Sequence, residues 1–258
     1  MKKIILITGA TSGIGRATAH LLGKNKDYQL IITGRRIERL EKVSQEIVQG
    51  GGNKPVLLCF DVRDAESCKQ QISSLPEEVS AIDVLVNNAG LAKGSGEIQE
   101  GNIENWDTMI DTNIKGLLYV TRAVTPGMVE RKAGHIINLC SIAGKEVYPR
   151  GNVYNATKFA VDALAKAMRM DLYNYNIKVS SVSPGAVEET EFAIVRYDGD
   201  KEKASIYNDY TPLKARDIAE IIEFVITRPI HVNINDVTVT ATQQASALLT
   251  NKSGRIFG

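Results

Sequence analysis

The sequence alternates short apolar runs with longer segments whose apolar residues recur at helical spacing. The apolar runs, each expected to form a strand, lie at 4–7, 29–33, 56–60, 84–86, 136–140, 178–182 and 237–240. The segments of helical spacing lie at 14–22, 37–48, 65–75, 103–120 and beyond, 153–173 and 216–226. This alternation is typical of right-handed βαβ units, and runs that are apolar throughout suit strands buried on both faces. It therefore predicts an α/β fold, a Rossmann-type doubly wound parallel sheet of about seven strands.

The chain offers no internal boundary between domains. Its 258 residues are enough for one large α/β domain, and no repeat or linker divides them, so we expect a single domain over 1–258. Only residues 184–213 follow neither spacing. Long irregular segments of compact domains are usually functional. We expect residues 186–213, called the lid segment below, to cover a substrate.

Charge, hydropathy and cysteine content exclude several classes of partner. A net charge of +1 gives no electrostatic footprint for nucleic acid. No apolar stretch approaches the ~20 residues that span a bilayer, and the apolar run after Lys3 is too short for a signal peptide. The three cysteines, an odd number without metal-ligand spacing, indicate free thiols in a reducing compartment. We therefore expect a cytoplasmic protein that binds no nucleic acid, membrane or metal.

A glycine-rich turn joins the first predicted strand directly to the first helix. Gly9 permits a tight turn, Gly13 lets the backbone approach a pyrophosphate, and Gly15 lets the helix pack closely on the sheet. The free N–H groups and dipole of the helix N-terminus favour phosphate. The spacing differs from the usual G-x-G-x-x-G pattern, and a purely structural turn is the alternative. The candidate nucleotide contacts here are Gly9, Thr11, Ser12, Gly13, Ile14 and Gly15.

Two arginines follow the second predicted strand, where the type of dinucleotide is usually decided. An acidic residue at this place bonds the 2′-hydroxyl of NAD, whereas a positive charge accommodates the 2′-phosphate of NADP. The chain has Arg35 and Arg36 and no carboxylate before Glu38. Guanidinium groups can bind a phosphate through paired hydrogen bonds. The alternative is a solvated helix start, but arginine there opposes the helix dipole and therefore indicates another role. The pair predicts NADP, with Arg35 as the main contact.

The ends of the third and fourth predicted strands add further candidates for the nucleotide site. Asp61 and Val62 could bond and pack on an adenine, although Asp61 or Asp64 could equally cap the next helix. The small residues of Asn87–Asn88–Ala89–Gly90 leave room for a dinucleotide, and we take Asn87, Ala89 and Gly90 as contacts. Asn113, beside Thr112 and Gly116 in a predicted helix, suggests a local kink because asparagine and glycine are weak helix formers.

A hydroxyl, a phenol and an amine occur in order around the fifth strand and the following helix. Ser141 ends the strand, and Tyr154 and Lys158 lie four residues apart, so they share one helix face about one turn apart. A phenol with its unperturbed pKa of about 10 is a poor acid or base at neutral pH. A nearby ammonium favours the phenolate and moves the pKa toward the useful range. Chance spacing is the alternative for the pair taken alone.

Taken together, these motifs resemble the short-chain dehydrogenase/reductase family. The matching residues are Thr8 to Gly15, Asp61, Val62, Asn87 to Gly90, Asn113, Ser141, Tyr154, Lys158, Pro184 and Gly185. The stretches 184–192, 195–197 and 228–235 further resemble the NADP-dependent 3-hydroxy acid dehydrogenases, which act on serine, L-allo-threonine and related acids and reduce malonic semialdehyde. The resemblance implies an NADP-dependent oxidoreductase and a homo-tetramer built on the long helices.

The resemblance also implies a role for individual residues. Tyr154 is the general acid or base, Lys158 lowers its pKa and bonds the nicotinamide ribose, and Ser141 orients the substrate oxygen. Asn113 holds a water that links Lys158 to solvent. Val187 and Thr190 hold the nicotinamide carboxamide, and Pro184 with Gly185 forms the floor beneath the ring. The cofactor supplies the hydride chemistry.

The carboxylate of a 3-hydroxy acid calls for a cation in the pocket. Arg150, before the catalytic helix, and Arg196, in the lid segment, are the candidates for a two-pronged contact, with a surface role as the alternative for each. The glutamates Glu188, Glu189 and Glu191 could suit the amino group of serine or could cap a helix of the lid segment.

Other functions remain open at this point. A 3-oxoacyl carrier-protein reductase or a general carbonyl reductase is the alternative enzyme, although the last strand lacks the glycine-rich turn typical of the former. A protein that senses NADP(H) without turnover could use the same fold. The presence of Ser141, Tyr154, Lys158 and Asn113 together favours an enzyme.

Overall fold

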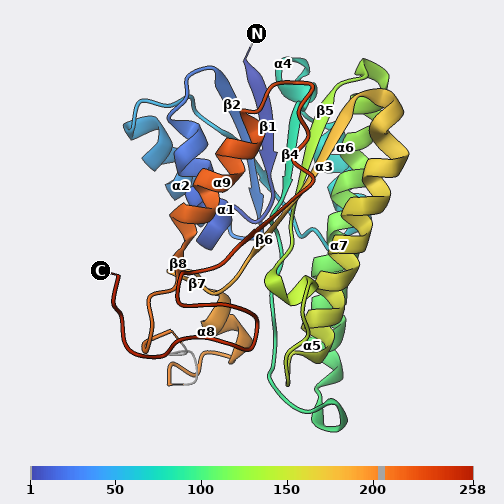
Figure 1. Cartoon of the computed structure of the whole chain (residues 1–258). Helices are drawn as coiled ribbons and strands as arrows, with labels where there is room; N and C mark the ends of the chain where they lie inside the picture. The colour runs from blue at the N-terminus through green and yellow to red at the C-terminus, as the bar shows by residue number, and fades with distance from the viewer. Residues whose placement is uncertain (1, 203–206, 258) are drawn as a thin grey trace.

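A computed structural model of the chain describes residues 2–202 and 207–257 (Figure 1). Among these residues, seven strands form one sheet in the order β3-β2-β1-β4-β5-β6-β9, and every neighbouring pair is parallel. They are β1 (Lys3–Ile7), β2 (Tyr28–Gly34), β3 (Val56–Cys59), β4 (Val84–Asn87), β5 (Gly134–Leu139), β6 (Ile177–Pro184) and β9 (Asp236–Val239). The predicted sheet is confirmed, with strand ends shifted by one or two residues.

The strand order reverses beside β1, and this reversal places the site. The chain runs outward from β1 through β2 to β3, then returns to β4 on the other side of β1. Ile5, Leu6 and Ile7 of this central strand are completely buried, as a strand covered on both faces requires. In open parallel sheets, ligands bind outside the carboxyl ends of the strands at such a reversal.

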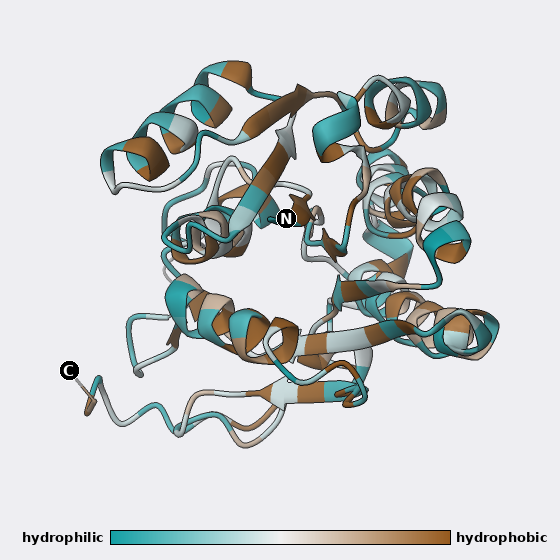
Figure 2. Cartoon of the chain, turned by 90° about the horizontal axis from the view of Figure 1, so that it is seen from above, coloured by the Kyte–Doolittle hydropathy of each residue, from teal (hydrophilic) through white to brown (hydrophobic). Residues whose placement is uncertain are grey.

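Two layers of helices cover the sheet. One layer holds α1 (Gly13–Gly23), α2 (Ile37–Gln49) and α9 (Ala215–Ile226), and the other holds α3 (Ala65–Ser73), α6 (Leu117–Arg131) and α7 (Asn152–Leu172) (Figure 1). Each layer packs on its own apolar core, and the apolar faces of the helices turn toward the strands (Figure 2). A short helix that we did not predict, α4 (Glu77–Ser80), precedes β4.

The segment predicted as one helix from residue 103 is interrupted near Asn113. It consists of α5 (Ile103–Ile110), a π-helical turn over Asp111–Gly116, and α6. A Cβ on Gly116 would come 2.7 Å from Val62 Cγ2, so the turn packs closely on the loop that follows β3. π-helical turns within helices frequently occur at functional sites. The expected local irregularity is therefore present.

The lid segment has more structure than its sequence indicated. Its two ends pair as a parallel ribbon of β7 (Val187–Glu188) and β8 (Leu213–Lys214), and α8 (Phe192–Arg196) follows β7. Elements of two to five residues carry no readable periodicity, so we considered a helix in this segment but predicted no bounds for it and no strands. Residues 203–206 of the segment lie outside the described residues. The ribbon closes the base of the segment beside the carboxyl end of the sheet.

The cysteines and the helices can be compared with the expectations from composition. Cys59, Cys68 and Cys140 are free thiols, as predicted. Across residues 2–202 and 207–257, no helix combines the length and the apolar character that crossing a membrane would need.

Candidate active site

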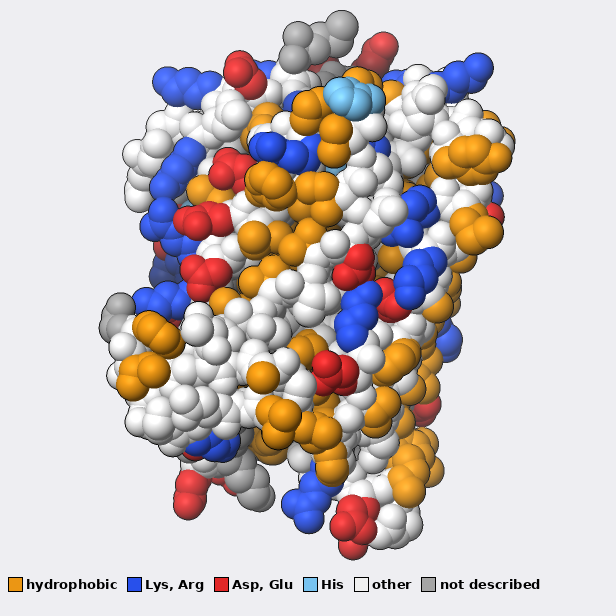
Figure 3. Space-filling view, in the orientation of Figure 1, with side chains coloured by type: hydrophobic (Ala, Val, Ile, Leu, Met, Phe, Trp, Pro, Cys, Tyr) orange, Lys and Arg blue, Asp and Glu red, His pale blue; other side chains and the backbone are white. Residues whose placement is uncertain are grey.

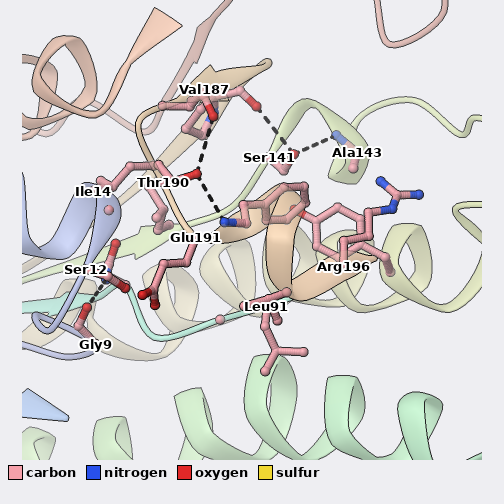
Figure 4. Close-up of a pocket in the computed structure, with 18 of the residues that line it drawn as sticks. Gly9, Ser12, Ile14, Leu91, Ser141, Ala143, Val187, Thr190, Glu191 and Arg196 are labelled. Carbon is pink, nitrogen blue, oxygen red and sulfur yellow. Dashed lines mark hydrogen bonds between the residues drawn. The ribbon is translucent and has the colours of Figure 1, made fainter. Parts of the chain in front are cut away.

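A cavity of about 470 Å³ runs along the carboxyl ends of the central strands, from the start of α2 to the start of α7, beneath the lid segment (Figure 4). Most sequence-predicted site residues line it. These are Gly9, Thr11, Ser12, Gly13, Ile14, Arg35, Arg36, Asp61, Val62, Ala89, Gly90, Ser141, Tyr154, Lys158, Pro184, Gly185, Val187, Thr190 and Arg196. Residues far apart in the sequence therefore meet in one place.

Four predicted site residues do not line this cavity, for identifiable reasons. Gly15 lies beneath the turn, where a Cβ would come 2.5 Å from the Gly9 carbonyl oxygen, so its role is close packing. Asn87 turns away from the cavity, and its buried amide nitrogen donates to Thr121 Oγ1 and Asn138 Oδ1. The neighbouring Asn88, which was not predicted, lines the cavity instead. Asn113 and Arg150 are described below.

The glycine-rich turn adopts the backbone geometry that its glycines permit. Gly9 and Gly13 have φ angles of +67° and +53°, in the left-handed region that favours glycine. A Cβ on Gly13 would come 3.2 Å from Thr190 Cβ, so the lid segment lies directly against the turn. The backbone N–H groups at the start of α1 are the expected phosphate contacts, because the N-terminus of a helix favours anions.

The end of the cavity next to the start of α2, where we expect adenosine and which we call the adenosine end, presents an array of guanidinium groups. Arg35 is more than half exposed, and its Nη1 lies 3.6 Å from Asp61 Oδ2. Arg36 Nη2 donates to Thr11 Oγ1 at 2.9 Å and lies 3.4 Å from Ser12 Oγ. These contacts place Arg36 between the glycine-rich turn and the start of α2. The donors fit a phosphate group at this end, as predicted for a 2′-phosphate.

Asp61 is separated from the helix-capping role that we considered for it. The cap of α3 is Asp64, whose side chain accepts hydrogen bonds from Glu66 N and Ser67 N. Asp61 lines the cavity and accepts from Arg63 Nε and Nη2 at 3.0 and 2.7 Å. Burial works against ionisation of Asp61, but the hydrogen bonds from Arg63 outweigh it and lower the pKa of the carboxyl. Asp61 is therefore a charged acceptor at the adenosine end.

The opposite end of the cavity brings Ser141, Tyr154 and Lys158 together. Ser141 begins a single 3₁₀ turn after β5; its hydroxyl accepts from Ala143 N at 3.1 Å and donates to the Pro184 carbonyl oxygen at 3.4 Å (Figure 4). Lys158 Nζ donates to the Leu139 carbonyl oxygen at 2.9 Å and lies 6.0 Å from the Tyr154 ring centroid. Tyr154 and Lys158 share the inner face of α7 and are almost completely buried. The three groups converge as predicted.

The pKa of Tyr154 departs from our expectation. Burial raises the pKa of the Tyr154 phenol far above its ordinary value, although a hydrogen bond with Ser141 acts in the other direction. Burial also lowers the pKa of Lys158. Desolvation disfavours both charged forms and is the largest influence on each of the two pKa values. In the structure described here, the phenol is therefore a protonated acid at neutral pH.

Asn113 lies behind this centre, and both the oxygen and the nitrogen of its side-chain amide form hydrogen bonds. Its Oδ1 accepts from Leu91 N at 2.9 Å, and its Nδ2 donates to the Leu91 carbonyl oxygen and to Thr157 Oγ1 at 2.8 and 3.0 Å. A Cβ on Gly90 would meet both Asn113 Oδ1 and Lys158 Nζ, at 3.2 and 3.6 Å. The π-helical turn thus holds Asn113 between the strand ends and α7, close to the lysine.

Of the two arginines considered for a carboxylate, one faces the cavity. Arg196 is 8% exposed, lines the cavity from α8, and donates from Nη1 to the Tyr148 hydroxyl at 3.0 Å. Its Nε is buried and has no partner among residues 2–202 and 207–257. A buried donor without an acceptor is costly unless a ligand completes it. Arg150 is exposed, has a φ of 61°, and borders a separate small cavity.

The three glutamates of the lid segment take different places. Glu188 binds Arg255 through two hydrogen bonds and does not line the cavity. Glu189 is exposed. Glu191 precedes α8 without a side-chain capping bond and contacts Arg36. None of these carboxylates forms an observed contact with the Ser141–Tyr154 pair in the described part of the chain.

Several cavity residues escaped sequence reasoning. They are Asn88, Leu91, Tyr148, Phe192, Tyr207, Tyr210 and Gln244. Phe192 packs edge-to-face on Tyr154, with ring centroids 5.5 Å apart. Gln244 Oε1 accepts from Ala186 N at 2.8 Å, fixing the backbone after Gly185. These residues belong to irregular segments where no spacing marks them; the aromatic character of the lid segment was the available signal.

Comparisons with known proteins agree with this geometry. A profile of the family described as short chain dehydrogenase matches residues 3–200. The NADP-dependent 3-hydroxy acid dehydrogenase YdfG of Salmonella typhi is 45% identical over 245 residues, which are 95% of this chain and 97% of that protein. Sulfoacetaldehyde reductase 2 of Chromohalobacter salexigens is 44% identical over 247 residues, covering 95% and 96%.

The similarity extends to a solved structure. The closed form of a serine dehydrogenase complexed with NADP⁺ matches with a TM-score of 0.90 and 42% identity, covering 96% of this chain and 98% of that chain.

Proposed function

The chain belongs to the short-chain dehydrogenase family, and we propose that it transfers a hydride between NADP(H) and a short 3-hydroxy acid or its 3-oxo form. The observation that carries the proposal is the buried Arg196 guanidinium, whose Nε lacks a partner in the described residues, in the same cavity as Tyr154. A carboxylate is the acceptor that a guanidinium fork fits best. Serine, L-allo-threonine and malonic semialdehyde are of this substrate type.

The cofactor assignment is supported by the donors along the cavity. We propose that Arg35 and Arg36 bind the 2′-phosphate, that Asp61, Val62, Ala89 and Gly90 surround the adenosine, and that the turn from Gly9 to Gly15 binds the pyrophosphate. Val187, Thr190 and the Pro184–Gly185 floor would hold the nicotinamide. When bound, the nicotinamide supplies or accepts the hydride. The backbone match to a closed, NADP⁺-bound serine dehydrogenase supports a closed conformation for this structure.

The chain's own residues would handle the proton and the orientation. Tyr154 donates its phenolic proton to the substrate oxygen in reduction and accepts it back in oxidation. Ser141 donates a hydrogen bond to the same oxygen. Lys158 bonds the nicotinamide ribose, and Asn113, positioned next to it, orders a water toward solvent. General acid catalysis of this kind contributes about 10²- to 10⁴-fold, and positioning contributes more.

The aromatic side chains at the substrate end of the cavity favour short substrates. Phe192 and Tyr148 close it around Tyr154, and Arg196 lies on the same side. The relative that reduces sulfoacetaldehyde is consistent with a short carbonyl compound carrying an anion. An acetoacetyl thioester has no carboxylate at the position where Arg196 could bind one.

A spectrophotometric assay tests this proposal. We expect NADPH absorbance at 340 nm to fall with malonic semialdehyde and not with acetoacetyl thioesters. The reverse preference would favour a 3-oxoacyl reductase. Tight NADPH binding with no turnover of any carbonyl compound would favour a nucleotide-sensing protein. Serine, L-allo-threonine and 3-hydroxyisobutyrate with NADP⁺ would then rank the hydroxy acids.

We also propose that the protein is a cytoplasmic homo-tetramer in which residues 186–213 act as the substrate lid of a single domain over 1–258. Apolar side chains lie exposed along the long helices, including Leu118 of α6 and Phe159 and Met170 of α7 (Figure 3). Packing these helices between subunits would cover them. The free cysteines suit a reducing compartment. Light scattering after size-exclusion chromatography would give the mass of the assembly.

A further inference from the structure

One side chain of the lid segment reaches across the cavity to the arginines at its adenosine end. Glu191 Oε2 lies 2.9 Å from Arg36 Nη2, and Glu191 Oε1 contacts Arg39 Nη1. Figure 4 shows the carboxylate extending from the lid segment toward Ser12 and the glycine-rich turn. These contacts join residues more than 150 positions apart in the chain. They are the described ion pairs that fasten the start of α8 to α2.

Local structure does not require this carboxylate. Glu191 occupies the N-cap position of α8 but makes no side-chain capping bond. Although burial opposes its ionisation, hydrogen bonds from Arg36 and Arg39 lower the pKa of Glu191 to about 2. The side chain is therefore charged at any physiological pH, and its charge is used between elements rather than within α8.

The arginine cluster has more positive charge than Glu191 neutralises. Arg36 and Arg39 both contact the carboxylate, and Arg35 has only the 3.6 Å contact with Asp61. A phosphate monoester carries roughly −2 at neutral pH. Three guanidinium groups therefore balance one carboxylate together with one 2′-phosphate. Both terminal nitrogens of Arg36 contact Glu191, whereas Arg35 is more than half exposed, so the phosphate can join the cluster at Arg35 while Glu191 stays bound.

We propose that Glu191 is a latch that fastens the lid segment over bound NADP(H), through the same arginine cluster that binds the 2′-phosphate. This inference rests on the proposed function. Glu191 lies directly after Thr190, the expected nicotinamide contact, and directly before α8, which carries Phe192 and Arg196. The latch therefore positions both the nicotinamide contact and the substrate arginine, and the nucleotide leaves only after Glu191 has released Arg36 and Arg39.

Nucleotide release tests the latch directly. Enzyme loaded with NADPH is mixed with excess NADP⁺ in a stopped-flow instrument, and the loss of enhanced NADPH fluorescence gives the dissociation rate constant. Glu191→Gln keeps the size of the side chain and removes its charge, and we expect dissociation about three- to ten-fold faster because truncation of a charge pair acts mainly on dissociation. The matched control is Glu188→Gln, the same change on the same segment, whose partner Arg255 lies outside the cavity. It should leave the rate within a factor of about two.

Arg39 offers an independent route to the same contact. It touches Glu191 but does not line the cavity, so Arg39→Gln breaks the latch without removing a cavity donor. We expect Arg39→Gln to accelerate dissociation about two- to five-fold, and the double variant to release NADPH no faster than Glu191→Gln alone, since residues in one network are non-additive.

The outcomes separate the latch from the proposed function. An unchanged rate in Glu191→Gln, an equal acceleration in Glu188→Gln, or additive effects of the two latch substitutions would overturn the latch while leaving NADPH as the cofactor. A wild-type protein that binds no NADPH would overturn the proposed function, and the latch with it.

Discussion

The two walls of the cavity are built by different means. The wall of strand ends and α7 has a nearly buried lysine bonded to the backbone, since Lys158 donates to the Leu139 carbonyl oxygen, and in addition Lys145 Nζ forms ion pairs with Asp162 of α7 and Asp236 of β9, at 2.6 Å each. The wall formed by the lid segment is held by partly exposed ion pairs, Glu191 with Arg36 and Glu188 with Arg255.

The backbone reinforces this difference. Within the lid segment, Glu189 and Asp198 have φ angles of 58° and 51°, in the region that non-glycine residues seldom adopt. The strands and α7 contain no such residue within their bounds in the described chain. Exposed ion pairs contribute about 0–1 kcal/mol each, so the lid wall is the one that can open. We therefore propose that the wall of strand ends and α7, called the fixed wall, keeps the proton-transfer groups in place, and that the wall formed by the lid segment, called the movable wall, opens to ligands.

The largest expected effect falls on the fixed wall. Tyr154→Phe removes the proton donor while keeping the ring against Phe192, so we expect kcat to fall by about 10²- to 10⁴-fold or more with NADPH affinity nearly unchanged. Initial rates at 340 nm and a fluorescence titration measure the two quantities. Tyr173→Phe, at an exposed position after α7, is the matched control. Substantial turnover in Tyr154→Phe would assign the acid to another residue.

A smaller effect should appear at the adenosine end of the cavity. Arg35→Glu places a negative charge beside the 2′-phosphate, and loss of charged hydrogen bonds is worth about 1.5–3 kcal/mol. We expect NADPH affinity to fall roughly 10- to 100-fold and NADH affinity to change little. Calorimetric titration with both nucleotides measures this. Arg216→Glu makes the same charge change on α9. Equal losses for both nucleotides would remove the 2′-phosphate assignment.

The smallest effect concerns how the free energy of unfolding depends on acid through His135 and Glu191. His135 of β5 is buried against Ser180, and burial lowers its pKa from 6.5 to about 3. The unfolded chain therefore binds this proton first, and stability falls as the pH drops below 6.5. Glu191 has the same sign at lower pH, because its pKa is lowered from 4.5 to about 2, so its contribution is complete above pH 4.5 and is lost only below it.

Unfolding measured at several pH values tests the contribution of His135. His135→Gln retains a polar partner for Ser180 and removes the titration, so the loss of unfolding free energy between neutral pH and about pH 5 should shrink by roughly 1–2 kcal/mol. Urea unfolding at several pH values measures it. An unchanged pH dependence would show that His135 is not buried as a neutral side chain.

The sequence predicted the fixed wall far better than the movable one. Strands, long helices and the turn from Gly9 to Gly15 have periodicities and spacings that can be read directly, and the convergence of Ser141 with Tyr154 follows from their order along a parallel sheet. The sequence could not show that the Asn87 side chain turns away from the cavity, because neighbouring strand residues face opposite sides of the sheet and the register was unknown. The pKa of Tyr154 depends on burial, which spacing does not reveal.

The contacts of the lid segment could not be predicted from the sequence. These contacts, such as Glu191 with Arg36, join distant residues through long side chains in segments without periodicity. Sequence reasoning placed Arg150 and Arg196 on equal terms, and only the three-dimensional structure directs Arg196 inward and Arg150 to the surface. Substrate selection is thus the feature that the sequence constrains least.

One comparison of substrates tests the central claim, that a buried guanidinium beside the proton donor selects a carboxylated carbonyl compound. Malonic semialdehyde and its methyl ester differ at the carboxylate, and kcat/KM is measured for both in the wild type, in Arg196→Ala and in the control Arg150→Ala. We predict that the wild type and Arg150→Ala prefer the acid by about 10-fold or more, and that Arg196→Ala loses this preference. An undiminished preference in Arg196→Ala would contradict the account.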